Sequence, residues 1–295
     1  MQTGAADRFI RAAMEDIAPF AALAALGSAA AHAVMALFTK RAGDTLVFRS
    51  VSLGLSALWL SPLLVLTPFP GWEVWRFLLL GAALIWAFNM LMISAFQRGD
   101  MNLVYPVMRG AAPALAGLLA FAVLGESLNP LAAAGLALAS ATLIAFAWPE
   151  RGGAPKLSAL GFALGAAVMT ASYTVTDAAG VRAADSTLQY LAWFFAISTL
   201  TIVATALIRR GRAYWPAAKR EFRPAFMSSF FNIATYGLAL WAYANAPVAP
   251  MAALRETSIV FGAVLAAFVL REPFGLKRGV LALALACALS LLQLA

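Results

Sequence analysis

The sequence is poor in the residues that build disulfides and most metal sites. Among its 295 residues it has one cysteine, Cys287, and one histidine, His32. A single cysteine cannot close a disulfide within the chain, and one histidine leaves little for a histidine-rich metal centre or a Ser/His catalytic pair. The metalloprotease pattern H-E-x-x-H and the phosphate-binding pattern G-x-x-x-x-G-K-[ST] are also absent. We therefore expect neither a metal nor another cofactor.

Charged residues are scarce as well. They make up 12% of the chain, whereas 63% of the residues are hydrophobic, and the mean hydropathy of +0.85 is far above that of a soluble domain of this length. This composition predicts an all-α integral membrane protein, because a helix of about 20 apolar residues crosses a hydrocarbon core of about 30 Å. We expect ten such spans, at Pro19 to Phe38, Thr45 to Leu66, Trp72 to Phe96, Asn102 to Leu124, Asn129 to Trp148, Leu157 to Ala179, Thr187 to Ile208, Phe222 to Tyr243, Val248 to Leu270 and Leu276 to Leu294.

The basic residues are distributed unevenly between the turns that join these spans. Of the 21 Lys and Arg residues, only Arg109 and Arg255 are expected at depth, and most others, including Arg49, are assigned to the turns after spans one, three, five, seven and nine. Cytoplasmic loops retain Lys and Arg, so this asymmetry predicts a multi-pass protein of the inner, or cell, membrane with both termini facing outward. The net charge of +8 is thus a property of loops, and no nucleic-acid partner is expected.

The chain contains an internal repeat. A shift of 146 residues places Asn102–Glu126 on Val248–Glu272, with Arg109 on Arg255 and Glu126 on Glu272. A unit of five spans is odd in number, so the second unit must enter the membrane in the opposite sense, which predicts two inverted five-helix repeats around a central cavity. The expected division is a leader or interfacial helix at 1–17, a first repeat at 18–148, a linker at 149–156 and a second repeat at 157–295.

Several short motifs resemble a known family. The first span ends in "HAVMALFTKRAGD", the sixth contains "YTVTD", and the fourth and ninth close in "LGE" and "LRE". In these features the sequence is similar to the EamA family of ten-span transporters in the drug/metabolite transporter superfamily, including its YddG-like amino-acid exporter branch. The resemblance implies a basket of ten helices around a cavity that opens alternately to either side. Family members are often described with cytoplasmic termini, whereas the loop charges here indicate the reverse.

The charged residues inside the spans are the first candidates for a binding site. An arginine at mid-membrane costs about 2.5 to 3.5 kcal/mol on insertion scales, so Arg109 and Arg255 should face a partner, water or a substrate carboxylate. Glu256 points about 100° away from Arg255 around a helix, and its partner could be another helix, a substrate ammonium or a proton. His32 could couple protons or be a hydrogen-bonded packing residue. Asp177 is expected at a gate or a solvated helix end.

Aromatic and amide side chains at helical spacing are the second group of candidates. They could line an apolar cavity with a few polar groups, as in small-molecule sites, or they could anchor helices at the membrane interface. Trp86, Tyr236 and Trp241 are the preferred cavity residues. The full group is Trp86, Asn89, Tyr105, Tyr173, Asn232, Tyr236 and Trp241.

These features together favour a secondary transporter of small organic metabolites, most of all an amino-acid exporter that works by alternating access. The alternatives are a transporter of other anionic metabolites, such as phosphorylated or phosphonate compounds, and an intramembrane hydrolase or acyltransferase. No segment is large enough to hold an ATPase, so the energy should come from gradients or exchange, without a nucleotide-hydrolysing subunit. The expected partners are a small-molecule substrate and the lipid bilayer. The sequence does not distinguish a monomer from a homodimer.

Overall fold

Helices make up the regular structure of the described chain. The computed structural model describes residues 3–98, 101–127, 129–147 and 157–270, together with helical residues 280, 281, 283–285, 287–289 and 291. No strand occurs within these ranges. Most of the tenth expected span, Leu276 to Leu294, lies outside them, as do Glu272 and the predicted linker at 149–156.

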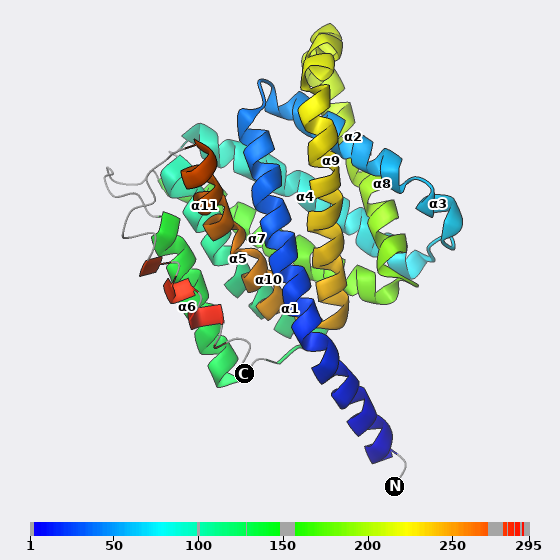
Figure 1. Ribbon diagram of the computed structural model, residues 1–295, viewed down its shortest axis with the longest axis vertical. Coiled ribbons are helices and arrows are strands. Elements are labelled where there is room, and N and C mark those ends of the chain that lie inside the picture. The colour runs from blue at the N-terminus through cyan, green and yellow to red at the C-terminus, as the bar shows by residue number, and fades with distance from the viewer. Residues whose placement is uncertain are drawn as a thin grey trace.

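Where the structure describes the connection between two helices, it is short, as between α1 and α2 or α7 and α8 (Figure 1). The expected leader at 1–17 is helical from Thr3 onward and continues into the first span without a break. The elements are α1 (Thr3–Arg41), α2 (Thr45–Leu60), α3 (Leu63–Leu66), α4 (Trp72–Arg98), α5 (Met101–Leu124), α6 (Pro130–Ala147), α7 (Leu157–Ala183), α8 (Thr187–Arg210), the 3-10 helix η1 (Gly211–Ala213), α9 (Tyr214–Asn245), α10 (Val248–Arg255) and α11 (Ser258–Leu270).

Six helical stretches of the described chain are long and apolar enough to cross a membrane, judged by length and composition. The last of them combines α8, η1 and α9, and the apolar part of α6 is shorter. This pattern is that of a multi-pass membrane protein. The six stretches are Pro19–Thr39, Thr45–Leu66, Trp72–Met92, Val107–Leu124, Leu157–Ala183 and Thr187–Asn245.

Helix α9 runs beside α1 and α2, while α7 lies against both α4 and α5 (Figure 1). These contacts join segments from the two predicted repeats. Small side chains allow helices to approach closely within a bilayer, and α7 buries a row of alanines that includes Ala163, Ala167 and Ala171. The core of the molecule is therefore formed between the two predicted repeats as well as within them.

The ninth expected span differs from the sequence prediction. We expected one helix from Val248 to Leu270, but the chain forms α10 up to Arg255 and α11 from Ser258, with a turn at Glu256 and Thr257. The hydroxyl of Thr257 donates to the carbonyl of Leu254 at 2.6 Å, which satisfies one backbone group at the break. Interrupted helices in transporters leave polar backbone and side chains at mid-membrane. Here the break coincides with the adjacent pair Arg255 and Glu256.

A close approach between α7 and α8 leads to a stability prediction. A Cβ at Gly180 would come closer than 3.0 Å to the ring of Tyr190, which is fully buried and donates a hydrogen bond to Asp177. We expect Gly180→Ala to destabilise the protein by about 1 to 3 kcal/mol through overpacking. A Cβ at Gly161, on the same helix, would meet nothing within 4 Å among the described residues beyond its own helix backbone, so Gly161→Ala should be neutral or slightly stabilising.

Thermal unfolding of both glycine variants in one detergent checks this prediction. The melting temperature should fall for Gly180→Ala only. Equal melting of the two variants would show that Tyr190 can move aside, contrary to the packing argument.

Candidate functional site

A small polar cavity lies at the break between α10 and α11. Its volume is about 20 Å³, which is room for a water molecule and too little for a metabolite. Both arginines expected at depth reach it from different helices. The lining residues are Arg109, Ala112, Pro113 and Ala116 of α5, Thr170, Tyr173 and Thr174 of α7, Tyr243 of α9, and Ala252, Arg255 and Glu256 at the break.

Arg109 is engaged with two other helical segments. Its Nη1 donates to Glu256 Oε1 at 3.2 Å, and its Nη2 lies 2.8 Å from His32 Nε2 on α1. The side chains of this ion pair are 15% and 9% exposed. Because a guanidinium has donors only, Nε2 of His32 must accept this bond and the ring proton must sit on Nδ1. His32 therefore serves here as a neutral hydrogen-bond acceptor, in line with the packing alternative.

Arg255 has different surroundings from its repeat counterpart Arg109. Its Nε donates to Ser28 Oγ at 3.2 Å and its Nη1 donates to Tyr243 Oη at 2.8 Å. The guanidinium carbon also lies 5.6 Å from the centroid of the Tyr243 ring. Within the described residues, both hydrogen-bond partners of Arg255 are neutral. Arg255 therefore lines the cavity without a hydrogen-bonded carboxylate in the described structure.

Glu256 bridges to another helix and keeps one oxygen unused. Its Oε1 forms the ion pair with Arg109, whereas its Oε2 is buried and has no hydrogen-bond partner within the described residues. Buried carboxylate oxygens almost always have a donor. Since Glu256 lines the cavity, this oxygen is available to a donor inside it. The cavity lining thus includes a guanidinium whose hydrogen-bond partners in the described structure are neutral, at Arg255, and a carboxylate oxygen without a partner there, at Glu256.

Asp177 is placed differently from the sequence expectation. We expected a gate or a solvated helix end, but α7 continues to Ala183 and Asp177 is only 2% exposed. It accepts hydrogen bonds from the hydroxyls of Tyr190, at 3.0 Å, and Tyr236. Tyr236 also stacks on Phe194, with ring centroids 4.1 Å apart. Asp177 and Tyr236 therefore form a buried tie between α7, α8 and α9 instead of lining the cavity.

Asn232 belongs to another polar cluster, between α2 and α9. Its amide donates to Ser52 Oγ at 2.7 Å and its Oδ1 accepts from Arg49 Nη1 at 3.4 Å. We assigned Arg49 to a cytoplasmic turn, and this assignment is wrong, because α2 begins at Thr45 and Arg49 also contacts Met35 Sδ at 3.2 Å. The cation is retained inside the protein by these polar partners.

Among the remaining aromatic and amide candidates, one lines the cavity and the others described do not. Tyr173 lines the cavity. Trp86 and Trp241 do not lie where we expected them: they are 52% and 36% exposed and are not among the lining residues. Asn89 donates to the carbonyl of Ile85 on its own helix. The side chain of Tyr105 lies outside the described part of the structure.

The two hydrogen-bond partners of Arg255, Ser28 and Tyr243, are not among the candidates chosen from the sequence. Ser28 lies one turn before His32 on the same face of α1, and Tyr243 shares its face of α9 with Tyr236, seven residues earlier. For both residues, the helical spacing was a signal that the sequence already contained. What identifies these residues is their bond to Arg255, which connects segments that are far apart in sequence.

Polar ties connect helices at both ends of the bundle. At one end, Arg210 Nε lies 2.7 Å from Asp44 Oδ2 and Glu221 Oε1 accepts from the Gly43 amide at 2.9 Å. The bond from Arg210 lowers the pKa of Asp44 below its ordinary value. At the other end, Glu126 pairs with Arg182 at 2.8 Å and accepts from the Val248 amide at 2.7 Å.

These ties lie at opposite ends of the helices in Figure 1, one at the α1–α2 connection and one where α9 leads into α10. Each connects a residue of the first predicted repeat to the second. The two ties therefore link the predicted repeats at both ends of the helices.

Comparisons with known proteins agree with a membrane transporter. Residues 157–294 match the EamA-like transporter family, a range that lies within the predicted second repeat. No curated protein matches the chain. A solved structure, titled only as the crystal structure of a protein, has a TM-score of 0.71 at 14% identity and covers 93% of this chain and 98% of that one. At this identity the likeness concerns the fold alone.

Proposed function

We propose that the protein is a secondary transporter of small zwitterionic metabolites, with amino acids as the preferred class, and that it works by alternating access. The observation that carries this proposal is that one cavity is lined by a guanidinium without a hydrogen-bonded carboxylate and by a carboxylate oxygen without a donor, among the described residues. Arg255 has neutral hydrogen-bond partners in the described structure, and Glu256 Oε2 has none there. An α-amino acid carries a carboxylate and an ammonium on one carbon and complements both.

The roles of the residues follow from their donors and acceptors. Arg255 would bind the substrate carboxylate through two parallel N–H bonds, which a guanidinium forms better than an ammonium does. Glu256 Oε2 would accept from the substrate ammonium. Tyr173 would border the side-chain end of the site. Arg109 would hold Glu256 in place through its ion pair.

The proposed mechanism uses ten helices in two inverted five-helix repeats, 18–148 and 157–295. Its support is that Arg109 and Arg255, which occupy equivalent repeat positions, reach the same cavity. The tie at Asp44 and the tie at Glu126 would then open in turn, each exposing the cavity to one side. The direction of transport, export from the cell, rests on the family resemblance. The outward-facing termini rest on the loop charges.

One alternative substrate class has its own structural support. Two guanidinium groups line one cavity, so a dianionic phosphorylated or phosphonate metabolite could bind both if Glu256 were protonated or displaced. An intramembrane enzyme has less support, because the match at 157–294 is to a transporter family.

Counterflow into proteoliposomes that hold only the purified protein tests the proposal. Labelled aromatic, aliphatic, hydroxyl and basic amino acids are offered one at a time against an internal pool of the same compound. We expect saturable uptake that unlabelled amino acid competes away. Uptake of phosphonates with no uptake of any amino acid would overturn the zwitterion assignment in favour of the dianion.

A further inference from the structure

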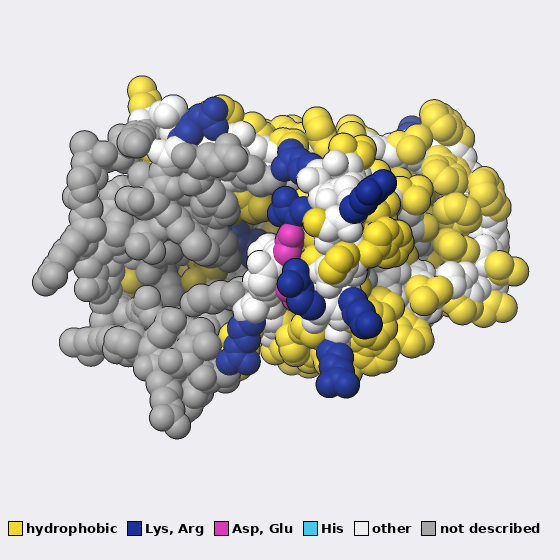
Figure 2. Space-filling view, turned by 90° about the horizontal axis from the view of Figure 1, so that it is seen from above, with side chains coloured by type: hydrophobic (Ala, Val, Ile, Leu, Met, Phe, Trp, Pro, Cys, Tyr) yellow, Lys and Arg dark blue, Asp and Glu magenta, His cyan; other side chains and the backbone are white. Residues whose placement is uncertain are grey.

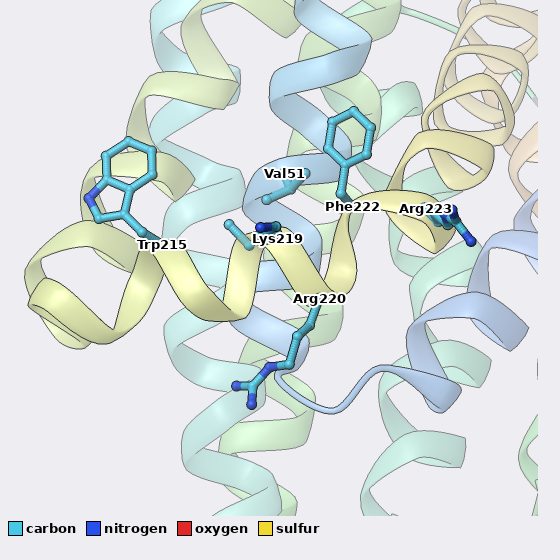
Figure 3. A pocket seen from close by; sticks show the side chains of 7 residues that line it. Val51, Trp215, Lys219, Arg220, Phe222 and Arg223 are labelled. Carbon is cyan, nitrogen blue, oxygen red and sulfur yellow. The ribbon is translucent and has the colours of Figure 1, made fainter.

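A second cavity lies at the start of α9. It is an open groove of about 420 Å³ and shares no lining residue with the small polar cavity at the break between α10 and α11. Figure 3 shows its side chains, which come from α9 except for one residue of α2. The groove residues are Val51, Trp215, Ala218, Lys219, Arg220, Phe222 and Arg223.

The groove combines exposed rings with exposed cations. Trp215 is 69% exposed and Phe222 is 48% exposed, and both rings project from the same side of α9 in Figure 3. Lys219 and Arg223 are exposed beside them. Aromatic rings and long basic side chains at the end of an apolar helix are typical of the membrane–water interface, where the ring contacts acyl chains and the cation reaches headgroups.

The basic residues around the start of α9 form a local excess of positive charge. Figure 2, which views the molecule from this end, shows Lys and Arg side chains gathered around the start of α9, with hydrophobic surface beside them. The nearby acids have other partners, since Asp44 pairs with Arg210 and Glu221 accepts from the Gly43 amide. In the part of the chain that the structure describes, Lys219 and Arg223 form no ion pair.

We propose that this groove binds the headgroup of an anionic phospholipid. The phosphodiester would lie between Lys219 and Arg223, and the acyl chains would run along Trp215 and Phe222. Charge complementarity selects an anionic headgroup over a zwitterionic one. The exposed rings favour a lipid over a soluble phosphate, which would gain nothing from them. This binding does not depend on the transported substrate.

The test compares two double variants that lose the same charge at the same end of the molecule. Lys219→Gln/Arg223→Gln alters groove residues, whereas Arg209→Gln/Arg212→Gln alters exposed residues that do not line it. Binding of fluorescent short-chain phosphatidylglycerol to the purified full-length protein is titrated for each. Phosphatidylcholine serves as the lipid control and glycerol 3-phosphate as the soluble competitor. Melting temperatures establish that both variants fold.

We expect saturable binding of phosphatidylglycerol that is at least about tenfold tighter than that of phosphatidylcholine. The groove variant should lose about tenfold in affinity and the control variant much less. An equal loss in both variants would mean a diffuse attraction to the whole basic end and would overturn the site. Competition by glycerol 3-phosphate at matched concentrations would assign the groove to a soluble anion instead.

Discussion

Replacing Arg255 with alanine is expected to reduce transport by at least about a hundredfold while leaving the protein folded. A charge-assisted bidentate contact to a carboxylate is worth about 1.5 to 3 kcal/mol, and its loss would also leave the substrate anion in a site without a cation. Arg255→Lys keeps the charge but not the planar fork, so transport should fall less, by about tenfold.

The folded state should tolerate the loss of Arg255 because its bonded partners are neutral. Ser28 Oγ keeps its hydrogen bond to the carbonyl of Thr235 at 2.6 Å when the arginine is absent. A cation inside an apolar span without a bonded carboxylate costs folding free energy, so Arg255→Ala should melt at the wild-type temperature or above it. Lower activity with unchanged or higher stability is the signature of a residue retained for function.

The measurement is counterflow at equal reconstituted protein, together with thermal unfolding in detergent. Arg76→Ala is the matched control, because Arg76 is exposed on α4 and, among the described residues, its contacts are with the Glu73 carbonyl and the Phe77 ring of its own helix. The control should transport at the wild-type rate. Wild-type transport by Arg255→Ala would remove Arg255 from the binding site.

Replacing Arg109 with methionine is expected to destabilise the protein by about 3 to 5 kcal/mol. The reason is that Glu256 would keep a buried carboxylate without the cation that pairs with it, and breaking a buried ion pair from one side costs this much. The same change at the repeat-equivalent position, Arg255→Met, removes a cation that has no carboxylate bonded to it and should cost far less. The two substitutions are chemically identical, so their difference compares an arginine bonded to a carboxylate with one bonded to neutral partners.

A double variant tests whether the cost arises from the unpaired carboxylate. In Arg109→Met/Glu256→Gln the buried charge is gone with its partner, and most of the lost stability should return. Unfolding in a denaturing detergent, followed by tryptophan fluorescence, measures all three variants on one scale. If Arg109→Met and Arg255→Met lose the same stability, the asymmetry drawn between the two arginines is wrong.

The membrane-embedded helical character of the protein could be predicted from composition and run length. Helix α5 begins at Met101 and α7 at Leu157, each within one residue of its expected span, since a bilayer demands about 20 apolar residues and turns follow where they end. The cost of placing a cation in lipid likewise directed attention to Arg109 and Arg255. Both arginines line the small polar cavity at the break between α10 and α11.

Which face of each helix is buried in the protein could not be predicted from composition and run length. In a soluble helix, polar residues mark the outer side, but lipid is as apolar as the protein interior, so an apolar residue carries no such mark. Trp86 was therefore expected inside and lies outside, and Asp177 was expected near the surface and is buried. The break after Arg255 was missed for a related reason, because no proline or glycine marks it.

The amino-acid sequence by itself determined that this chain forms apolar helices that suit a bilayer and that Arg109 and Arg255 are charged residues within such helices. Only the tertiary structure decided which arginine bonds to a carboxylate, because Glu256 meets Arg109 across 147 positions of the chain. Hydrophobic length is a local property of a segment, whereas the pairing of buried charges depends on which helices lie side by side.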